Sequence, residues 1–330
     1  MLASSYLYAS GKIRALEPKV LDRTDIERMV DAPDFTTAFK VLNDTDYANN
    51  LLDIQPHNYR DALRADLTNV FELLSIIIPD PCLLKVLFIK RDYLNIKLLL
   101  KQKFFGVELS SSLVGDTLYP LPPIQDMIME GKTTSAPAEM RASLSRILKQ
   151  LGSEPSPSQI DTITTRMYFE HAGQLAKKIN NRFLTKLLEV QINGLNILNL
   201  IRGKRLGLDG SELEKHLVPG GSIDSQSLLK LYEAENSELR PLVSRHFDLE
   251  ALQRFNSFLE NDNLHELEKS FEDFEIRFLR QAKMVAYGPE VVVAYFYAKR
   301  NADRNVRLIM TGKLNNMPGD EIKKTLREVY

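Results

Sequence analysis

The sequence predicts an all-α fold, and three observations carry this prediction. Apolar residues recur at steps of three to five positions, as between Ala62 and Leu74 and between Ile179 and Val190, which is the spacing of one helix face. Runs that alternate apolar and polar residues, as strands do, are nearly absent. One helical pattern, with an asparagine near its start and a lysine near its end, occurs three times. We therefore expect an all-α chain built from repeated units.

The composition is that of a globular protein large enough for two or three domains. The chain has 330 residues, 44% of them apolar and 26% charged, with a net charge of −1. A near-neutral chain lacks the basic excess of a dedicated nucleic-acid binder, so we expect no nucleic acid as partner. Cys82 is the only cysteine, which excludes a disulfide framework and a thiolate metal cluster.

The chain shows no segment typical of membrane insertion. Its first residues, "MLASSYLYASGKIRALEP", lack the basic and apolar regions of a signal peptide. The longest apolar stretch, from Leu73 to Ile89, is interrupted by prolines and charged residues, whereas a spanning helix needs ~20 mostly apolar residues. We expect a cytosolic or peripheral protein.

Each copy of the repeated pattern is preceded by another long helical stretch, at residues 64–77, 165–180 and 267–284. The segment 290–298, "EVVVAYFYA", comes nearest to a strand pattern, but Pro289 in front of it is a common first residue of a helix. Segments rich in Pro, Gly or Ser separate the helical regions, at residues 119–125, 152–158 and 218–225.

The repeated helix follows each of these stretches. Its three copies read "NIKLLLKQKFFG", "NILNLIRGKRLG" and "NVRLIMTGKLNN". The shared positions are an asparagine, a lysine eight residues later, and a glycine or asparagine eleven residues later: Asn95, Lys103, Gly106; Asn196, Lys204, Gly207; Asn305, Lys313, Asn316. Glycine and asparagine most readily adopt the left-handed conformation that closes a helix, so the pattern encodes a helix and its end.

The copies lie about 100 residues apart, which is a common domain length and too long for a short-repeat solenoid. The sequence therefore predicts three similar helical domains, at residues 1–118, 119–222 and 223–330. Three equal units in one chain suggest a pseudo-threefold arrangement.

Motifs for catalysis or nucleotide binding are missing. Gly203–Lys204 and Gly312–Lys313 resemble the end of a phosphate loop, but Leu198 and Arg307 stand where that loop needs its first glycine. The five histidines are dispersed, with no HExxH pair. Acidic pairs such as Asp44 and Asp46 are typical of turns and caps. We expect no catalytic residue, no cofactor, no bound metal and no directly bound nucleotide.

The repeated polar residues allow two interpretations. A structural one makes the asparagines amides that hydrogen-bond neighbouring backbone in an apolar interface, and the lysines cations near helix C-termini. Under the alternative, Lys103, Lys204 and Lys313 lie on one rim and contact a ring-shaped partner.

On these residues the chain resembles the C subunit of the V/A-type rotary ATPases, a relative of the d subunit of eukaryotic V-ATPases. The similarity is clearest in "KRDYLNIKLLLKQKFFG" (90–106) and over 286–330, with its Tyr-x-x-x-Lys helix and Asn-x-Arg…Gly-Lys…Pro ending. The segment 35–47 also matches. Glutamates usual in the family are replaced here around Arg300 and Ala302, which leaves an acidic contact from that helix in doubt.

The resemblance implies three helical domains arranged as a funnel with a central cavity. It implies a non-catalytic subunit of the central stalk, a socket that couples the rotating shaft, of D and F type subunits, to the membrane rotor ring. The protein would then lie on the cytoplasmic face of the membrane and serve ion transport coupled to ATP hydrolysis or synthesis. The competing interpretation is a generic cytosolic helical scaffold or adaptor, which explains the missing motifs but not the repeated signature.

Overall fold

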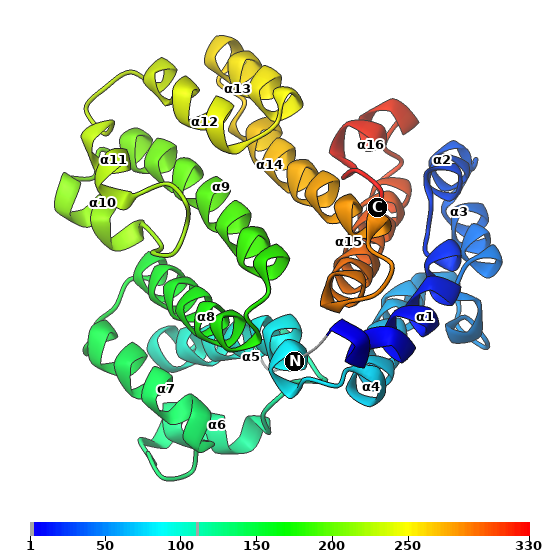
Figure 1. Ribbon diagram of the computed structural model, residues 1–330, viewed down its shortest axis with the longest axis horizontal. Coiled ribbons are helices and arrows are strands. Elements are labelled where there is room, and N and C mark those ends of the chain that lie inside the picture. The colour runs from blue at the N-terminus through cyan, green and yellow to red at the C-terminus, as the bar shows by residue number, and fades with distance from the viewer. Residues whose placement is uncertain (1–2, 110–111) are drawn as a thin grey trace. The chain divides into compact units, whose positions relative to one another are not determined.

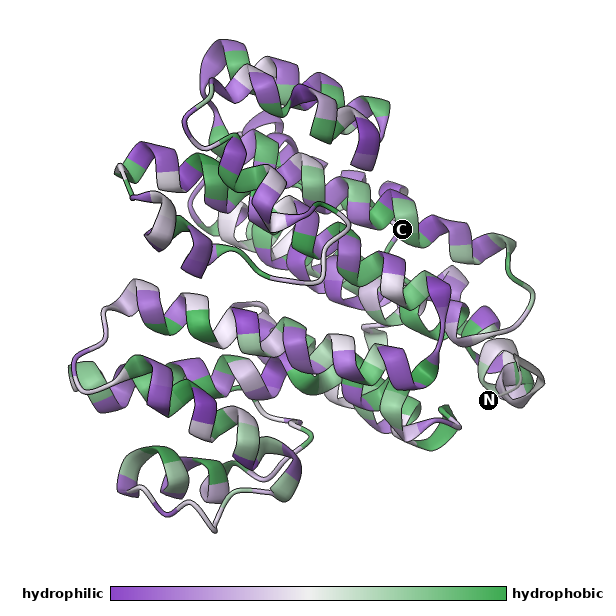
Figure 2. Cartoon of the chain, turned by 60° about the vertical axis from the view of Figure 1, so that its left-hand side comes forward, coloured by the Kyte–Doolittle hydropathy of each residue, from purple (hydrophilic) through white to green (hydrophobic). Residues whose placement is uncertain are grey.

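The computed structural model describes residues 3–109 and 112–330, and every regular element in these ranges is a helix. The all-α prediction is confirmed. Figure 1 shows the helices in chain order, and Figure 2 shows apolar and polar residues alternating along most of them, as expected when one face of each helix packs against a core. Within the described ranges, no helix combines the length and the apolar composition needed to cross a bilayer.

The chain packs as two compact units. The first consists of Met1–Asp80 together with Lys269–Tyr330, and the second of Pro81–Glu268. The first unit therefore contains both ends of the chain, and the second contains its middle.

The second unit is built on three long helices, α5 (Pro81–Phe105), α8 (Pro157–Ile179) and α9 (Arg182–Leu206). Its shorter helices are α6 (Leu121–Glu130), α7 (Ala138–Leu151), α10 (Gly210–His216), α11 (Ser225–Lys230), η7 (Asn236–Leu239), α12 (Arg240–His246) and α13 (Leu249–Asn261).

The first unit is built on α4 (Tyr59–Ile77) and α15 (Pro289–Leu314). Its other elements are η1 (Ala3–Tyr6), α1 (Leu7–Leu16), η2 (Glu17–Lys19), α2 (Arg23–Asp31), α3 (Phe35–Val41), η3 (Leu42–Asp44), η4 (Ala48–Asn50), η5 (Pro56–Asn58), η8 (Arg280–Met284) and α16 (Gly319–Thr325). Helix α14 (Leu264–Leu279) begins in the second unit and ends in the first.

Local sequence explains where the long helices begin and end. Ser156 and Gln159 form a reciprocal capping box at the start of α8, and Pro157 takes the first helical position, where its missing N–H costs no hydrogen bond. Asn180 ends α8 in the left-handed conformation, and the Asn181 side chain caps α9. Pro289 is the first residue of α15, so the segment 290–298 is helical.

The core of the second unit is the antiparallel pair α5 and α8. Lys97 and Lys101 of α5 both pair with Asp161 near the start of α8, while Tyr93 near the middle of α5 contacts His171 further along α8. Between these contacts most of the buried side chains, such as Ile96 and Met167, are apolar. The pairing direction places the C-terminus of α5 beside the N-terminus of α8.

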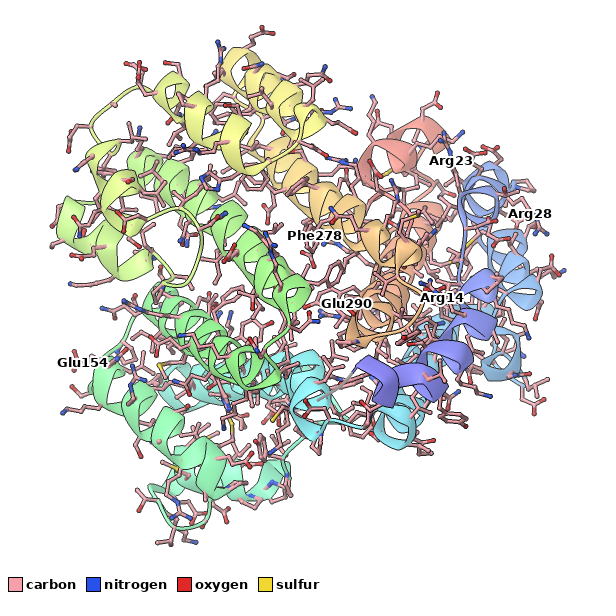
Figure 3. All side chains as sticks on the ribbon, viewed as in Figure 1. Arg14, Arg23, Arg28, Glu154, Phe278 and Glu290 are labelled. Atoms are coloured by element: carbon pink, nitrogen blue, oxygen red, sulfur yellow. The ribbon has the colours of Figure 1, made fainter. Side chains whose placement is uncertain are left out.

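In the first unit, α15 packs against α1, α2, α3 and α4, so a helix near the end of the chain lies among helices of the segment Met1–Asp80. Arg14 of α1 donates to the carbonyl oxygens of Ala282 and Val285 at 2.7 and 2.6 Å, just before α15 begins (Figure 3). These hydrogen bonds hold the start of the chain against the segment that enters α15.

Candidate functional site

The three repeated asparagines make the same pair of hydrogen bonds. Each amide nitrogen donates to a backbone carbonyl, and the N–H of that same residue donates back to the amide oxygen. The pairs are Asn95 with Val114 (2.8 and 2.7 Å), Asn196 with Val218 (2.8 and 2.8 Å), and Asn305 with Arg327 (3.0 and 2.9 Å). We call each pair an asparagine clamp. The amide thus replaces a backbone partner for a segment that belongs to no helix.

The clamps lie in the interior. Asn95, Asn196 and Asn305 are at most 1% exposed. In such surroundings an unpaired backbone N–H or C=O is costly, and asparagine offers both a donor and an acceptor in the right geometry. The clamps fix the chain 19 residues after the first asparagine and 22 after the second and third. This is the hydrogen bonding that the structural interpretation of the asparagines describes.

The residues eleven positions after the asparagines all have a positive φ. Gly106 is at 66°, Gly207 at 64° and Asn316 at 53°. They follow the ends of α5, α9 and α15 and turn the chain out of each helix.

A second shared position explains the glycines that precede two of the lysines. A Cβ on Gly203 would lie 3.0 Å from Leu213 of α10, and a Cβ on Gly312 only 2.7 Å from Ile322 of α16. These glycines therefore allow a short helix to pack closely on α9 and on α15. They belong to helix packing and not to a phosphate loop. The first copy has Gln102 at this position.

A third polar position lies three residues before the asparagine in two copies. Asp92 accepts hydrogen bonds from the N–H groups of Leu118 and Tyr119, at 3.2 and 3.0 Å. Asn193 accepts from the N–H of Ile223 at 3.1 Å and donates to Ser222 Oγ at 2.9 Å. Burial raises the pKa of the Asp92 carboxyl to about 6, although its two backbone donors favour the ionised form.

The three lysines each donate to a backbone carbonyl: Lys103 to Ile128, Lys204 to Ala234 and Lys313 to Ala32. The first two acceptors follow their lysines in the sequence, whereas Ala32 lies near the start of the chain. Burial lowers the pKa of the Lys204 amine. The lysine ammonium groups are thus engaged within their own units, and a contact with a ring-shaped partner stays a prediction.

Helix α15 also carries a buried charged group that the other two copies lack. Lys299 is 1% exposed, and its Nζ lies 2.6 Å from Asp46 Oδ2, 2.8 Å from Asp66 Oδ2 and 4.4 Å from the centre of the Tyr47 ring. We call these four residues the Lys299 cluster. It joins α15 to α4 and to the loop after η3, so two carboxylates and an aromatic face surround one ammonium group.

Burial raises the pKa of the Asp66 carboxyl to about 6, and the Lys299 charge only partly opposes this. Burial also raises the pKa of the Tyr47 hydroxyl well above its usual range, and the Asp66 charge adds to the effect. A perturbed carboxyl can indicate catalysis. Here it is enclosed by an ion pair inside a helical core, which is the arrangement of a structural cluster.

Sequence reasoning missed this cluster. It assigned Asp46 to a turn, and Lys299 served only as part of the family pattern. The available signal was the position of Lys299 in its helix, because it falls among the buried residues Tyr295, Ala298 and Ala302. A lysine on the apolar face of a helix requires buried partners.

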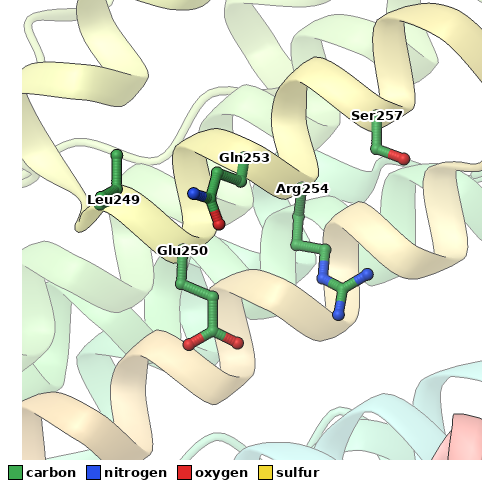
Figure 4. Close-up of a pocket in the computed structure, with 5 residues that line it drawn as sticks. All are labelled: Leu249, Glu250, Gln253, Arg254 and Ser257. Carbon is green, nitrogen blue, oxygen red and sulfur yellow. The ribbon is translucent and has the colours of Figure 1, made fainter.

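Two further features of the described residues bear on catalysis and metal binding: a surface pocket and the placement of possible metal ligands. Leu249, Glu250, Gln253, Arg254 and Ser257 line a pocket along one face of α13 (Figure 4). In the described part of the chain, no three His, Cys, Asp or Glu side chains are placed to hold a metal ion together.

Comparison with known proteins decides the family. The family model of the ATP synthase (C/AC39) subunit matches residues 9–325. The chain belongs to this family. Its relatives include the C subunit of the V-type sodium ATPase of Enterococcus hirae, 21% identical over 318 residues that cover 96% of this chain and 97% of the relative. Another is the C subunit of the A-type ATP synthase of Thermococcus kodakarensis, 25% identical over 348 residues, with coverage of 98% and 91%.

The C subunit of the A-type ATP synthase of Methanocaldococcus jannaschii is 24% identical over 353 residues, with coverage of 97% and 86%. The resemblance to the V/A-type C subunits is thus confirmed over nearly the whole chain. The family is that of a structural subunit of the ATPase complex and not of an enzyme in its own right.

Proposed function

We propose that this chain is the socket of a V/A-type rotary ATPase, the non-catalytic central-stalk subunit that couples the rotating shaft to the membrane rotor ring. The observation that carries the proposal is the family match over residues 9–325. The three asparagine clamps support it, because a body that transmits torque must hold its segments rigidly. Close-packed helical cores have low compressibility and transmit strain.

The proposal includes three helical domains, at residues 1–118, 119–222 and 223–330, arranged as a funnel about a pseudo-threefold axis. Its support is the equivalence of the three long helices α5, α9 and α15, which share the clamp, the left-handed exit and the lysine contact with a carbonyl. Equivalent local geometry in three copies is expected when three units descend from one plan.

The proposed partners are the shaft subunits of D and F type on one side and the rotor ring on the other, with the chain peripheral to the cytoplasmic face of the membrane. Each interface should bury more than ~1,000 Å², since a stable protein contact needs about that area.

The test is reconstitution. The purified chain should bind the shaft subunits, bind the isolated ring, and bridge the two when all are mixed, while showing no ATPase activity alone. ATP-driven ion transport should be lost when the chain is omitted and return when it is added. Normal coupling between motor and ring in its absence would contradict the proposal.

A further inference from the structure

The turn between α8 and α9 is a local concentration of positive charge. From His171 to Leu188 the sequence contains no aspartate or glutamate but has four cations, Lys177, Lys178, Arg182 and Lys186. The chain as a whole has a net charge of −1, so this stretch departs clearly from the average. We call these four residues the basic turn.

Most of this charge is not neutralised within the protein. All four side chains are exposed. Lys186 pairs with Glu189 at 2.9 Å, but the side chains of Lys177, Lys178 and Arg182 make no ion pair or hydrogen bond within residues 3–109 and 112–330. By contrast, some exposed cations elsewhere in the second unit, such as Arg205 with Asp262, have carboxylate partners.

The backbone holds these cations at one tip. Lys177 and Lys178 occupy the last turn of α8, and Asn180 reverses the chain in the left-handed conformation. The Asn181 side chain accepts from the N–H of Leu184 at 2.9 Å, which anchors Arg182 as the first residue of α9. Figure 1 shows the two helices joined by this short turn.

Charged groups of both signs lie beside Lys186. Burial lowers the pKa of His246 at the end of α12, and the charges of Arg245 and Lys186 lower it further, while Glu189 opposes them. The exposed Arg245 therefore stands near the side of the basic turn that Lys186 occupies.

We propose that the basic turn binds the anionic headgroups of phospholipids, and so contacts the membrane surface directly. The cations are mostly lysines at the turn between two helices, and no exposed large apolar side chain lies between residues 171 and 188. Protein interfaces are poor in lysine and use aromatic or arginine anchors in their cores, so these features favour lipid over protein. Clusters of four or more cations beside a membrane bind acidic lipid by charge.

The experiment uses the full chain and vesicles of phosphatidylcholine with or without phosphatidylglycerol, assayed by co-sedimentation. Binding should require the anionic lipid and weaken steeply with salt, because salt screens exposed charges. The triple variant Lys177→Gln, Lys178→Gln, Arg182→Gln should bind about a hundredfold more weakly, since each cation contributes about fivefold at such a surface.

The matched control is Lys149→Gln, Lys215→Gln, Lys230→Gln. These exposed lysines also lie in the last turns of helices of the same unit and have no ion pair in the described part of the chain. This variant has the same net charge and should retain binding to within about threefold, which is the scatter expected for such contributions.

Equal loss in both variants, or no preference for anionic vesicles, would overturn the proposal. So would a basic-turn variant that keeps vesicle binding but loses co-purification with shaft or ring, since the turn would then be a protein contact. Co-purification is measured in parallel, so failure of the socket function is seen separately from failure of lipid binding.

Discussion

Helices α9 and α15 share a clamp, a close-approach glycine and a lysine bound to a carbonyl, yet the charge buried in their interiors differs. Six residues before the asparagine, α9 has Val190, and α5 has Ile89 at the same place; both are buried. In α15 this position is Lys299, enclosed by Asp46 and Asp66. Two copies thus bury an apolar side chain at the position where the third copy buries an ion pair.

The difference follows from which segment each helix must hold. The carbonyls reached by Lys103 and Lys204 lie 25 and 30 residues further along the chain, so short connections bring them close. Helix α15 packs against helices of Met1–Asp80, with Lys299 and Asp46 separated by 253 positions. Apolar contacts alone only weakly fix how far one helix is shifted along another, whereas a buried charge must meet its partner in one alignment. We therefore expect the Lys299 cluster to fix the alignment of α15 with the helices of Met1–Asp80.

The largest effect should come from Lys299→Met. This change leaves two buried carboxylates without their cation and should lower the free energy of unfolding by about 3–5 kcal/mol. Chemical denaturation measures it. Arg304→Met on the same helix removes an exposed pair with Glu272 and should cost less than about 1 kcal/mol.

The cluster also allows a sharper version of that experiment. Adding Asp46→Asn and Asp66→Asn to Lys299→Met removes all three charges, and most of the lost stability should return. If the triple variant were as unstable as Lys299→Met alone, packing and not charge would explain the loss.

Asn196→Ala should cause the next largest loss of stability. It leaves the N–H and C=O of Val218 buried without partners and should cost about 2–4 kcal/mol. Asn95→Ala should cost less, because Val114 is only half-buried and water can reach its backbone. Denaturation curves of the two variants rank them, and the reverse order would show that burial of the clamped residue does not set the cost of losing a clamp.

The pH dependence of stability tests the difference between the first copy, which has Asp92, and the second, which has Asn193 at the equivalent position. Because the folded-state pKa of Asp92 is raised to about 6, its protonated form is favoured by folding, and stability is lost as pH rises from about 4 to 6. The loss is at most about 3 kcal/mol for a shift of this size. Asp92→Asn gives the first copy the amide that Asn193 provides in the second, and should flatten this part of the profile.

Asp66 titrates in the same range for the same reason, so a residual slope should remain in Asp92→Asn. Measuring the free energy of unfolding of the wild type and of Asp92→Asn at several pH values between 4 and 7 separates the contribution of Asp92 from that of Asp66. An unchanged profile in Asp92→Asn would mean that this carboxyl is ionised throughout.

The smallest effects should come from the close-approach glycines. Gly312→Ala places a Cβ 2.7 Å from Ile322 and should cost about 1–3 kcal/mol, partly offset by the better helix propensity of alanine. Gly203→Ala should cost less, since its contact with Leu213 is 3.0 Å. Thermal unfolding gives the order, with Gln102→Ala as the neutral reference.

Much of the fold could be predicted from the sequence because the signals are local. Helical spacing, Pro289 as a first residue, and glycine or asparagine at the helix ends each depend on neighbours within a few positions. The three asparagines stood out because they repeat. Their partners could not be foreseen, since Val114, Val218 and Arg327 have no common side chain and contribute only backbone.

The Lys299 cluster shows why the long-range contacts could not be predicted from the sequence. Asp46 and Asp66 are ordinary acidic residues in sequence, and only the packing of α4 and α15 brings them to one nitrogen. The lysine contacts are similar, because the acceptor for Lys313 is a carbonyl near the opposite end of the chain. Contacts between residues so far apart in the chain produce no periodic pattern in the sequence.

The enclosure of α15 by helices of Met1–Asp80 also has a consequence for biosynthesis. A ribosome adds ~5–20 residues per second, so Asp46 leaves it on the order of 10–50 s before Lys299 does. For that time the early helices lack the surface that will cover them, whereas the second unit is complete as soon as Glu268 has been added. We therefore expect the unit of Met1–Asp80 and Lys269–Tyr330 to complete its folding last, and newly made chains to expose apolar surface chiefly there.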